Sequence, residues 1–239
     1  MFIDKGQKMT VSAADGRPVP VRLEINPKAR RLILRVDPKA REGVAVAPSA
    51  RMAGEAAAFA AERADWIQAS LDGLPRARPF EPGADIPVRG ESVRLSLEGP
   101  GRRTALLAGP PPRLAAPGAP ETFGDRVKRF LKGEARADLS EAVARHARTL
   151  GVDPQRISVK DTRSRWGSCT SDGRLSFSWR LILAPPDVLD YVAAHECAHL
   201  LEMNHSPRFW AQVTRCVGDP KAGRRWLRQH GEALHAYGA

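Results

Sequence analysis

The sequence predicts an α+β protein with small sheets, several amphipathic helices and one helix that carries a candidate metal site. Three observations support this prediction. Short segments that alternate apolar and polar residues, as strands do, recur through the first half of the chain. Segments 49–74 and 122–150 instead follow the helical period. Residues 187–210 contain a His-Glu-x-x-His motif and a third histidine.

The composition indicates a globular protein without a transmembrane helix. The chain has 239 residues, of which 42% are hydrophobic, enough for one large or two small domains with real cores. No apolar run of about 18 residues occurs, and segment 1–10 lacks the apolar stretch of a signal peptide. Three cysteines without CxxC spacing are present. We therefore expect a reduced, cytoplasmic protein that does not bind membranes.

The net charge of +11 leaves two interpretations open. It would suit an anionic partner, either nucleic acid or a nucleotide. The basic clusters are short, however, and few aromatic residues lie near them. A basic surface that contacts only solvent fits the same pattern, so the charge alone does not identify a partner.

Residues 1–75 are expected to form a small β-rich unit with one helix. Segment 20–36 reads as two strands around a turn at 27–30, and segment 43–47 reads as a third strand that ends at Pro48. Ser49 is expected to cap the helix that follows.

Segment 79–118 contains many prolines and glycines, with short alternating pieces at 86–88 and 93–97. This pattern favours β-hairpins. We place the domain boundary in 109–120. Residues 1–120 then form an N-terminal β-rich subdomain with one helix and a Pro/Gly-rich hairpin region, and residues 121–239 form the catalytic domain.

The second half is predicted to place two strands directly before the motif helix. A long helix covers 122–150, a strand begins at 157–159, and a second strand covers 174–183 after a turn at 171–173. Pro185 and Pro186 end that strand and start the motif helix, which should end near Asn204. Ser206 and Pro207 are expected to start another helix, and a basic helix follows at 221–237.

The motif residues are His195, Glu196 and His199, followed by His205. Histidines four residues apart leave the same face of a helix, so both imidazoles can bind one metal ion. His205 lies between the end of one helix and the start of the next, which favours it as a third ligand. The competing interpretation is that these histidines only pack or cap.

Three histidines are typical of a catalytic zinc site, which keeps its fourth position open. Zinc would activate a water molecule, and Glu196 would act as general base and return the proton to the leaving amine. For stabilisation of the oxyanion, Tyr191, His230 and Tyr237 are weak candidates. The spacing also matches the metzincin pattern, but Glu202 replaces its glycine and no methionine follows His205, so a metzincin is disfavoured.

The chain resembles the YgjP-like metal-dependent hydrolases, zinc-metallopeptidase-like proteins of the broader SprT-like group. The resemblance is specific over about residues 123–235. It rests on TRSRWGSC, the hairpin, YVxxHExxHLxxxNHSxxFW and WLxxHGxxL. It implies a zincin-like catalytic domain with one Zn²⁺ per chain, with His195, His199 and His205 as ligands and Glu196 as catalytic acid and base.

The segment before the second strand is a candidate substrate edge. In zincin-like folds an edge strand near the metal pairs with extended substrate. Trp166 and Gly167 would shape the cleft, and Arg163 or Arg165 would bind an anionic group of the substrate. Equally, Trp166 could pack the hairpin onto the helix while the arginines pair with acids.

The leading hypothesis is a zinc metallopeptidase acting on peptide or unfolded protein. The rival is a metal-dependent nucleotide pyrophosphohydrolase of the UTP type, although triphosphate chemistry usually uses Mg²⁺ bound by carboxylates. A nucleic-acid-associated protein with structural zinc is the third hypothesis, but such a site does not need Glu196. The sequence predicts neither the physiological substrate nor the oligomeric state.

Overall fold

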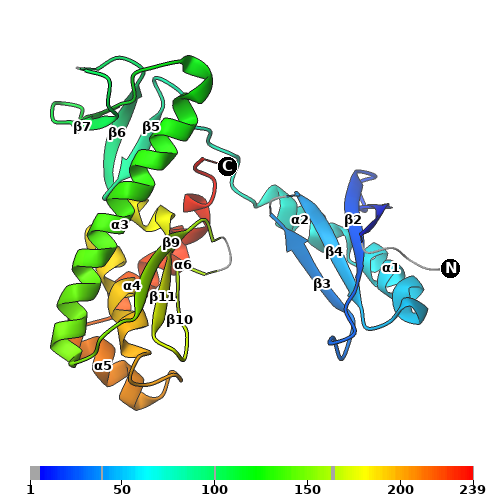
Figure 1. Cartoon of the computed structure of the whole chain (residues 1–239). Coiled ribbons are helices and arrows are strands. Elements are labelled where there is room, and N and C mark those ends of the chain that lie inside the picture. The colour runs from blue at the N-terminus through cyan, green and yellow to red at the C-terminus, as the bar shows by residue number, and fades with distance from the viewer. Residues whose placement is uncertain (1–5, 39, 100, 163–164, 239) are drawn as a thin grey trace. The chain divides into compact units, whose positions relative to one another are not determined.

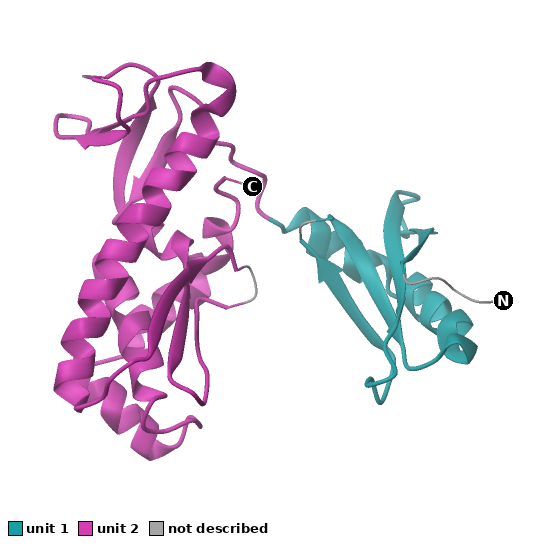
Figure 2. Ribbon diagram, in the orientation of Figure 1, with its two compact units in different colours: residues 1–74 teal, residues 75–239 magenta. Residues whose placement is uncertain are grey.

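The computed structural model describes residues 6–38, 40–99, 101–162 and 165–238. It divides into two compact units, Met1–Leu74 and Pro75–Ala239 (Figure 2). Both units combine helices with small sheets, which confirms the predicted α+β class. Among the described residues, no helix is long and apolar enough to cross a membrane.

The first unit is a four-stranded sheet covered on one face by helices. The sheet has the order β1-β2-β4-β3, and only β2 and β4 run parallel. Helices α1 and α2 pack on the face that includes Val21, Ala45 and Gly43; a Cβ at residue 43 would lie 3.0 Å from Ile67. The elements are β1 Gln7–Ser12, β2 Pro18–Ile25, β3 Ile33–Asp37, β4 Glu42–Ala47, α1 Ala53–Glu62 and α2 Ala64–Asp72.

The helix expected after Ser49 differs from the prediction in two respects. It begins as a short 3₁₀ turn, Ala50–Met52, and it is interrupted at Arg63, so that two helices form. Ser49 occupies the N-cap position, but its side chain makes no capping hydrogen bond. The strands at 20–36 and 43–47 were predicted correctly.

The second unit begins with a small sheet that packs on the long helix α3, Phe123–Leu150 (Figure 1). Its strands have the order β5-β6-β8-β7. Leu95 and Leu114 of this sheet share one buried cluster with Val127 and Leu131 of α3. The elements are β5 Asp85–Val88, β6 Glu91–Ser96, β7 Ala105–Leu107, β8 Arg113–Ala115 and the 3₁₀ turn Pro120–Thr122.

The observed division therefore differs from the expected boundary near residue 120. The compact units divide between Leu74 and Pro75. Segment 109–120, which was expected to be a boundary or an exposed loop, contains strand β8 with Leu114 fully buried. The many prolines and glycines of this region favoured a loop prediction, although the region contains a strand that belongs to the same core as α3.

The rest of the second unit carries the motif helix. A three-stranded sheet has the order β10-β11-β9, with β11 antiparallel to β10 and parallel to β9. The strand expected at 174–183 ends at Ser178, and a 3₁₀ segment, Trp179–Leu183, continues into the core. The elements are β9 Arg156–Lys160, β10 Gly167–Cys169, β11 Arg174–Ser178, α4 Pro186–Ala198, α5 Pro207–Val217 and α6 Lys221–Leu234.

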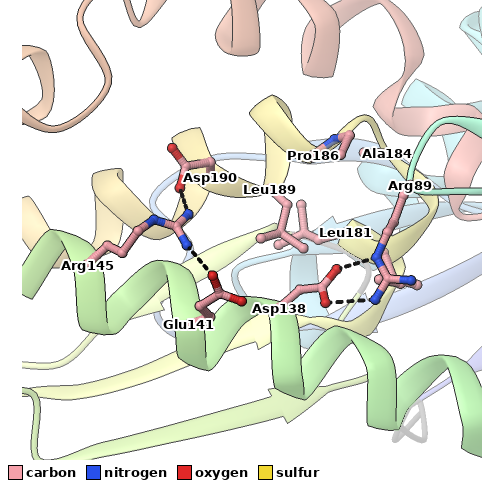
Figure 3. A pocket seen from close by; sticks show the side chains of 10 residues that line it. Arg89, Asp138, Glu141, Arg145, Leu181, Ala184, Pro186, Leu189 and Asp190 are labelled. Carbon is pink, nitrogen blue, oxygen red and sulfur yellow. Dashed lines mark hydrogen bonds and ion pairs between the residues drawn. The ribbon is translucent and has the colours of Figure 1, made fainter.

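Ion pairs fix helix α4 against α3. Asp190 of α4 accepts hydrogen bonds from Arg145, at 2.8 Å, and contacts the buried His146 at the same distance. A cavity of about 220 Å³ lies beside this pair, and Arg89 and Asp138 also line it (Figure 3). Arg89 is bonded to Asp138 at 2.8 Å. Because the arginines lining the cavity already pair with its carboxylates, we assign it a structural role in holding α4.

Candidate metal centre

Three histidine nitrogens converge at the C-terminal end of α4. His195 lies in the last turn of the helix, His199 caps it, and His205 lies in the loop before α5. Their candidate ligand atoms all lie within 4.8 Å of one another. The Nε2 atoms of His195 and His205 are 3.1 Å apart. Ligands at the usual Zn–N distance in a tetrahedral site would be separated by about 3.3 Å, so this spacing fits one zinc ion.

Local contacts orient the imidazoles. Nδ1 of His199 lies 3.0 Å from the carbonyl oxygen of Glu202. A hydrogen bond donated by this Nδ1 leaves Nε2 free to bind a metal, as is common for histidine ligands. The ring of Phe209 contacts His195, His199 and His205, with centroid distances of 4.8, 4.5 and 4.7 Å.

Of the two contacts predicted to hold the loop that carries His205, the structure contains the one at the start of α5. Ser206 is the N-cap of α5, and its hydroxyl accepts a hydrogen bond from the backbone N–H of Phe209 at 3.4 Å. Asn204 was expected to close α4 near its own position, but the helix ends at Ala198. The Asn204 side chain instead accepts the Ser206 backbone N–H at 3.1 Å.

The environment favours neutral histidines, the form that binds metals. Burial, together with the charges of His199, His205 and Arg224, lowers the pKa of His195 to about 3. Burial also lowers the pKa of His199. The Nδ1 atom of His195 is buried without a hydrogen-bond partner in the described structure. His195 and His199 are therefore expected to be neutral at neutral pH.

Glu196 lies beside the histidines and is almost completely buried, with 5% of its surface exposed. Burial raises the pKa of this carboxyl to about 7, and the charge of Arg165 opposes the rise. Gly167 of strand β10 lies against it, because a Cβ at residue 167 would stand 2.4 Å from Glu196 Oε1. The carboxylate is thus enclosed between helix α4 and the edge strand β10.

The predicted substrate-binding residues have different surroundings. Gly167 lies at Glu196, and the exposed Arg165 acts electrostatically on the same carboxylate. Trp166 stacks on His235, with ring centroids 4.7 Å apart and planes at 17°, and its ring faces Gly231 of α6. Trp166 therefore makes a packing contact at the C-terminal end of α6. Arg163 lies outside the described residues.

The three candidates for oxyanion stabilisation, Tyr191, His230 and Tyr237, also lie in different surroundings. The ring of Tyr191 lies 6.0 Å from that of His195. Tyr237 is bonded through its hydroxyl to Arg78 at 2.7 Å, and His230 packs on Trp226 at 4.9 Å. Of these residues, only Tyr191 contacts a histidine of the centre.

Three residues near the histidines were not predicted as part of the site. Phe209 and Trp210 contact the imidazole rings, and Arg224 contacts Trp210. The aromatic pair lies four and five residues after His205 in the chain, a signal that could have identified it. Arg224 gave no usable signal, since it is one of several arginines on α6. Only the packing of α6 against α4 distinguishes it.

Comparison with known proteins gave one family and one structural match. A family model described as YgjP-like, metallopeptidase domain, matches residues 30–230. No curated protein matches the chain. Among solved structures, the chain is similar to the "metallopeptidase zymogen of Pyrococcus abyssi abylysin", with 16% identity and a TM-score of 0.35 over 38% of this chain and 93% of that chain. The range of the family model includes the three histidines and Glu196.

Proposed function

The chain belongs to the YgjP-like metallopeptidase family, and on this premise we propose that it is a zinc-dependent peptidase with one zinc ion per chain. His195, His199 and His205 would hold the ion. The observation that carries this proposal is the convergence of three imidazoles beside a buried carboxylate.

The donor set suits zinc better than a hard cation. Imidazole nitrogens are borderline ligands that favour Zn²⁺, whereas Mg²⁺ and Ca²⁺ take oxygen ligands. Three protein ligands leave a fourth position for a reacting group, as in catalytic zinc sites. Zinc would supply a Lewis acid that polarises the carbonyl to be attacked and acidifies water.

Glu196 is the proposed general base. Its carboxylate would accept a proton from the attacking water and pass it to the leaving amine. Enclosure by Gly167 and helix α4 supports this role, because a desolvated carboxylate holds a proton more strongly than one in water.

Strand β10 is the proposed binding edge for an extended peptide or an unfolded segment. It lies at one edge of its sheet and contacts α4 beside Glu196. A strand added at such an edge binds mainly through its backbone, so many sequences would be accepted. Arg165 would contribute a positive charge near the reacting groups.

The experiment compares hydrolysis of an unstructured protein such as casein with hydrolysis of nucleoside triphosphates. We expect casein cleavage that stops after chelation of zinc and returns when zinc is added. Triphosphate hydrolysis that depends on Mg²⁺ and survives zinc chelation would instead support a nucleotide pyrophosphohydrolase.

A further inference from the structure

A pocket of about 540 Å³ lies between α5 and α6. Its lining includes Trp210 of α5 and both Lys221 and Arg224 of α6. Trp210 joins this pocket to the metal centre, since its ring centroid lies 5.9 Å from that of His195 and 6.0 Å from that of His205. A group bound here would therefore be one aromatic side chain away from the histidines.

A close contact between helices places Arg224 at this position. Gly223 packs against Tyr191 of α4, and a Cβ at residue 223 would lie only 2.7 Å from the Tyr191 Cβ. Tyr191 is one helical turn before His195, and their rings are 6.0 Å apart. The missing side chain at residue 223 thus lets the start of α6 approach the histidines, with Arg224 next in the chain.

The charge of Arg224 is available to a ligand. Its guanidinium carbon lies 5.3 Å from the Trp210 ring centroid, a cation–π contact that leaves N–H groups of the guanidinium free. Over the residues described by the structure, no carboxylate pairs with Arg224 or Lys221. The one carboxylate lining the pocket, that of Asp219, accepts the backbone N–H of Lys221 at 2.9 Å.

Ring contacts link Arg224 to the metal centre. Its guanidinium contacts the Trp210 ring, and that ring contacts the rings of His195 and His205. The guanidinium is therefore one aromatic side chain away from the histidines.

We propose that Arg224 anchors a carboxylate of the substrate in the pocket between α5 and α6. This inference rests on the proposed peptidase function and adds a specificity-determining residue to it. Arginine binds carboxylates through two parallel hydrogen bonds, and its stack on Trp210 pre-orients it for this contact. The carboxylate comes either from an Asp or Glu side chain near the cleaved bond or from the C-terminus of the peptide.

The test measures kcat and KM with three kinds of peptide of equal length. The reference is neutral with an amidated C-terminus. A second series moves one glutamate through the positions around the cleaved bond, also with an amidated end. A third peptide is neutral with a free C-terminus. The glutamate series tests a side-chain carboxylate, and the peptide with a free end tests a C-terminal carboxylate.

We expect a carboxylate to lower KM. The Arg224→Gln change should reduce the ratio of kcat/KM between the carboxylate peptides and the neutral peptide by about tenfold. Arg224→Lys should restore only part of it, because lysine cannot form the paired hydrogen bonds. The matched control is Arg225→Gln, which removes an exposed charge from the same helix outside the pocket and should keep the preference. A merely structural role would predict another result, because a disturbed fold would weaken the neutral and the carboxylate peptides by the same factor.

Binding provides a second readout that does not require cleavage. Fluorescence anisotropy of the same peptides on zinc-loaded Glu196→Gln protein should show the carboxylate preference, and the added Arg224→Gln change should abolish it. Equal binding with and without Arg224 would overturn the inference, as would a wild-type enzyme indifferent to carboxylates. Failure to cleave any peptide would contradict the proposed peptidase function, and the anisotropy would still decide the role of Arg224.

Discussion

Gly167 and Glu196 are in direct contact: a Cβ on residue 167 would stand 2.4 Å from the Glu196 Oε1 atom and 2.7 Å from its Cδ. Strand β10 and helix α4 therefore approach as closely as a glycine allows. This contact fixes the position of the carboxylate relative to His195 and His199. It also explains why glycine occupies the first position of β10, since any side chain there would collide with Glu196.

Gly167→Ala should reduce peptidase activity by at least about tenfold without unfolding the protein. The added methyl group would displace the Glu196 carboxylate, and a shift of about 1 Å in a catalytic group is costly. Activity and thermal unfolding should be measured together. The matched control is Gly133→Ala on α3, where a Cβ meets nothing within 4 Å. Wild-type activity in Gly167→Ala would show that this contact does not position the base.

His205→Ala should weaken zinc binding by about 100-fold or more, since a three-ligand site would lose a direct ligand. Competition with a chromophoric zinc chelator measures the change. His230→Ala is the control, because His230 is exposed on α6 and packs on Trp226 rather than on the centre. Equal zinc affinity in wild type and His205→Ala would exclude His205 as a ligand.

The His146–Asp190 pair should make stability fall as the pH rises through the neutral range. Burial alone would lower the pKa of His146, but the hydrogen bonds to Asp190 and Cys216 raise it from 6.5 to about 9. A histidine with a higher pKa in the folded state stabilises the fold when protonated. Its contribution is complete below pH 6.5 and is lost as the pH approaches about 9, with a maximum of about 3 kcal/mol.

Chemical denaturation of wild type and Asp190→Asn between pH 6 and pH 9.5 measures this effect. The difference in free energy of unfolding should shrink as the pH rises. Glu141→Gln is the control, because it removes the other carboxylate bonded to Arg145 without touching His146. Parallel pH profiles for wild type and Asp190→Asn would contradict the assigned ion pair.

Much of the fold could be predicted because local patterns determined it. The helix expected at 122–150 is observed as Phe123–Leu150, and the capping role of Ser206 was predicted with its side-chain hydrogen bond. The three histidines could be grouped because helical geometry brings residues 195 and 199 together regardless of the surrounding fold. A boundary near residue 120 was expected instead of Leu74, since nothing local revealed that Leu114 packs against α3.

The surroundings of the centre depend on packing between distant segments. The contact between Gly167 and Glu196 joins residues 29 positions apart, and the contact between Gly223 and Tyr191 joins residues 32 positions apart. Trp166 was equally compatible with a cleft and with a packing role, and its stack on His235 could not be foreseen. Such contacts have no signature in the sequence of either segment.

The most direct measurement is the activity and zinc content of Glu196→Gln compared with wild type. Glutamine has nearly the same size as glutamate but cannot act as a base, and Glu196 is not one of the proposed ligands. We predict one zinc ion in each protein and a loss of peptide hydrolysis of at least about 100-fold in the variant. Hydrolysis at the wild-type rate by zinc-loaded Glu196→Gln protein would contradict the assignment of Glu196 as the general base.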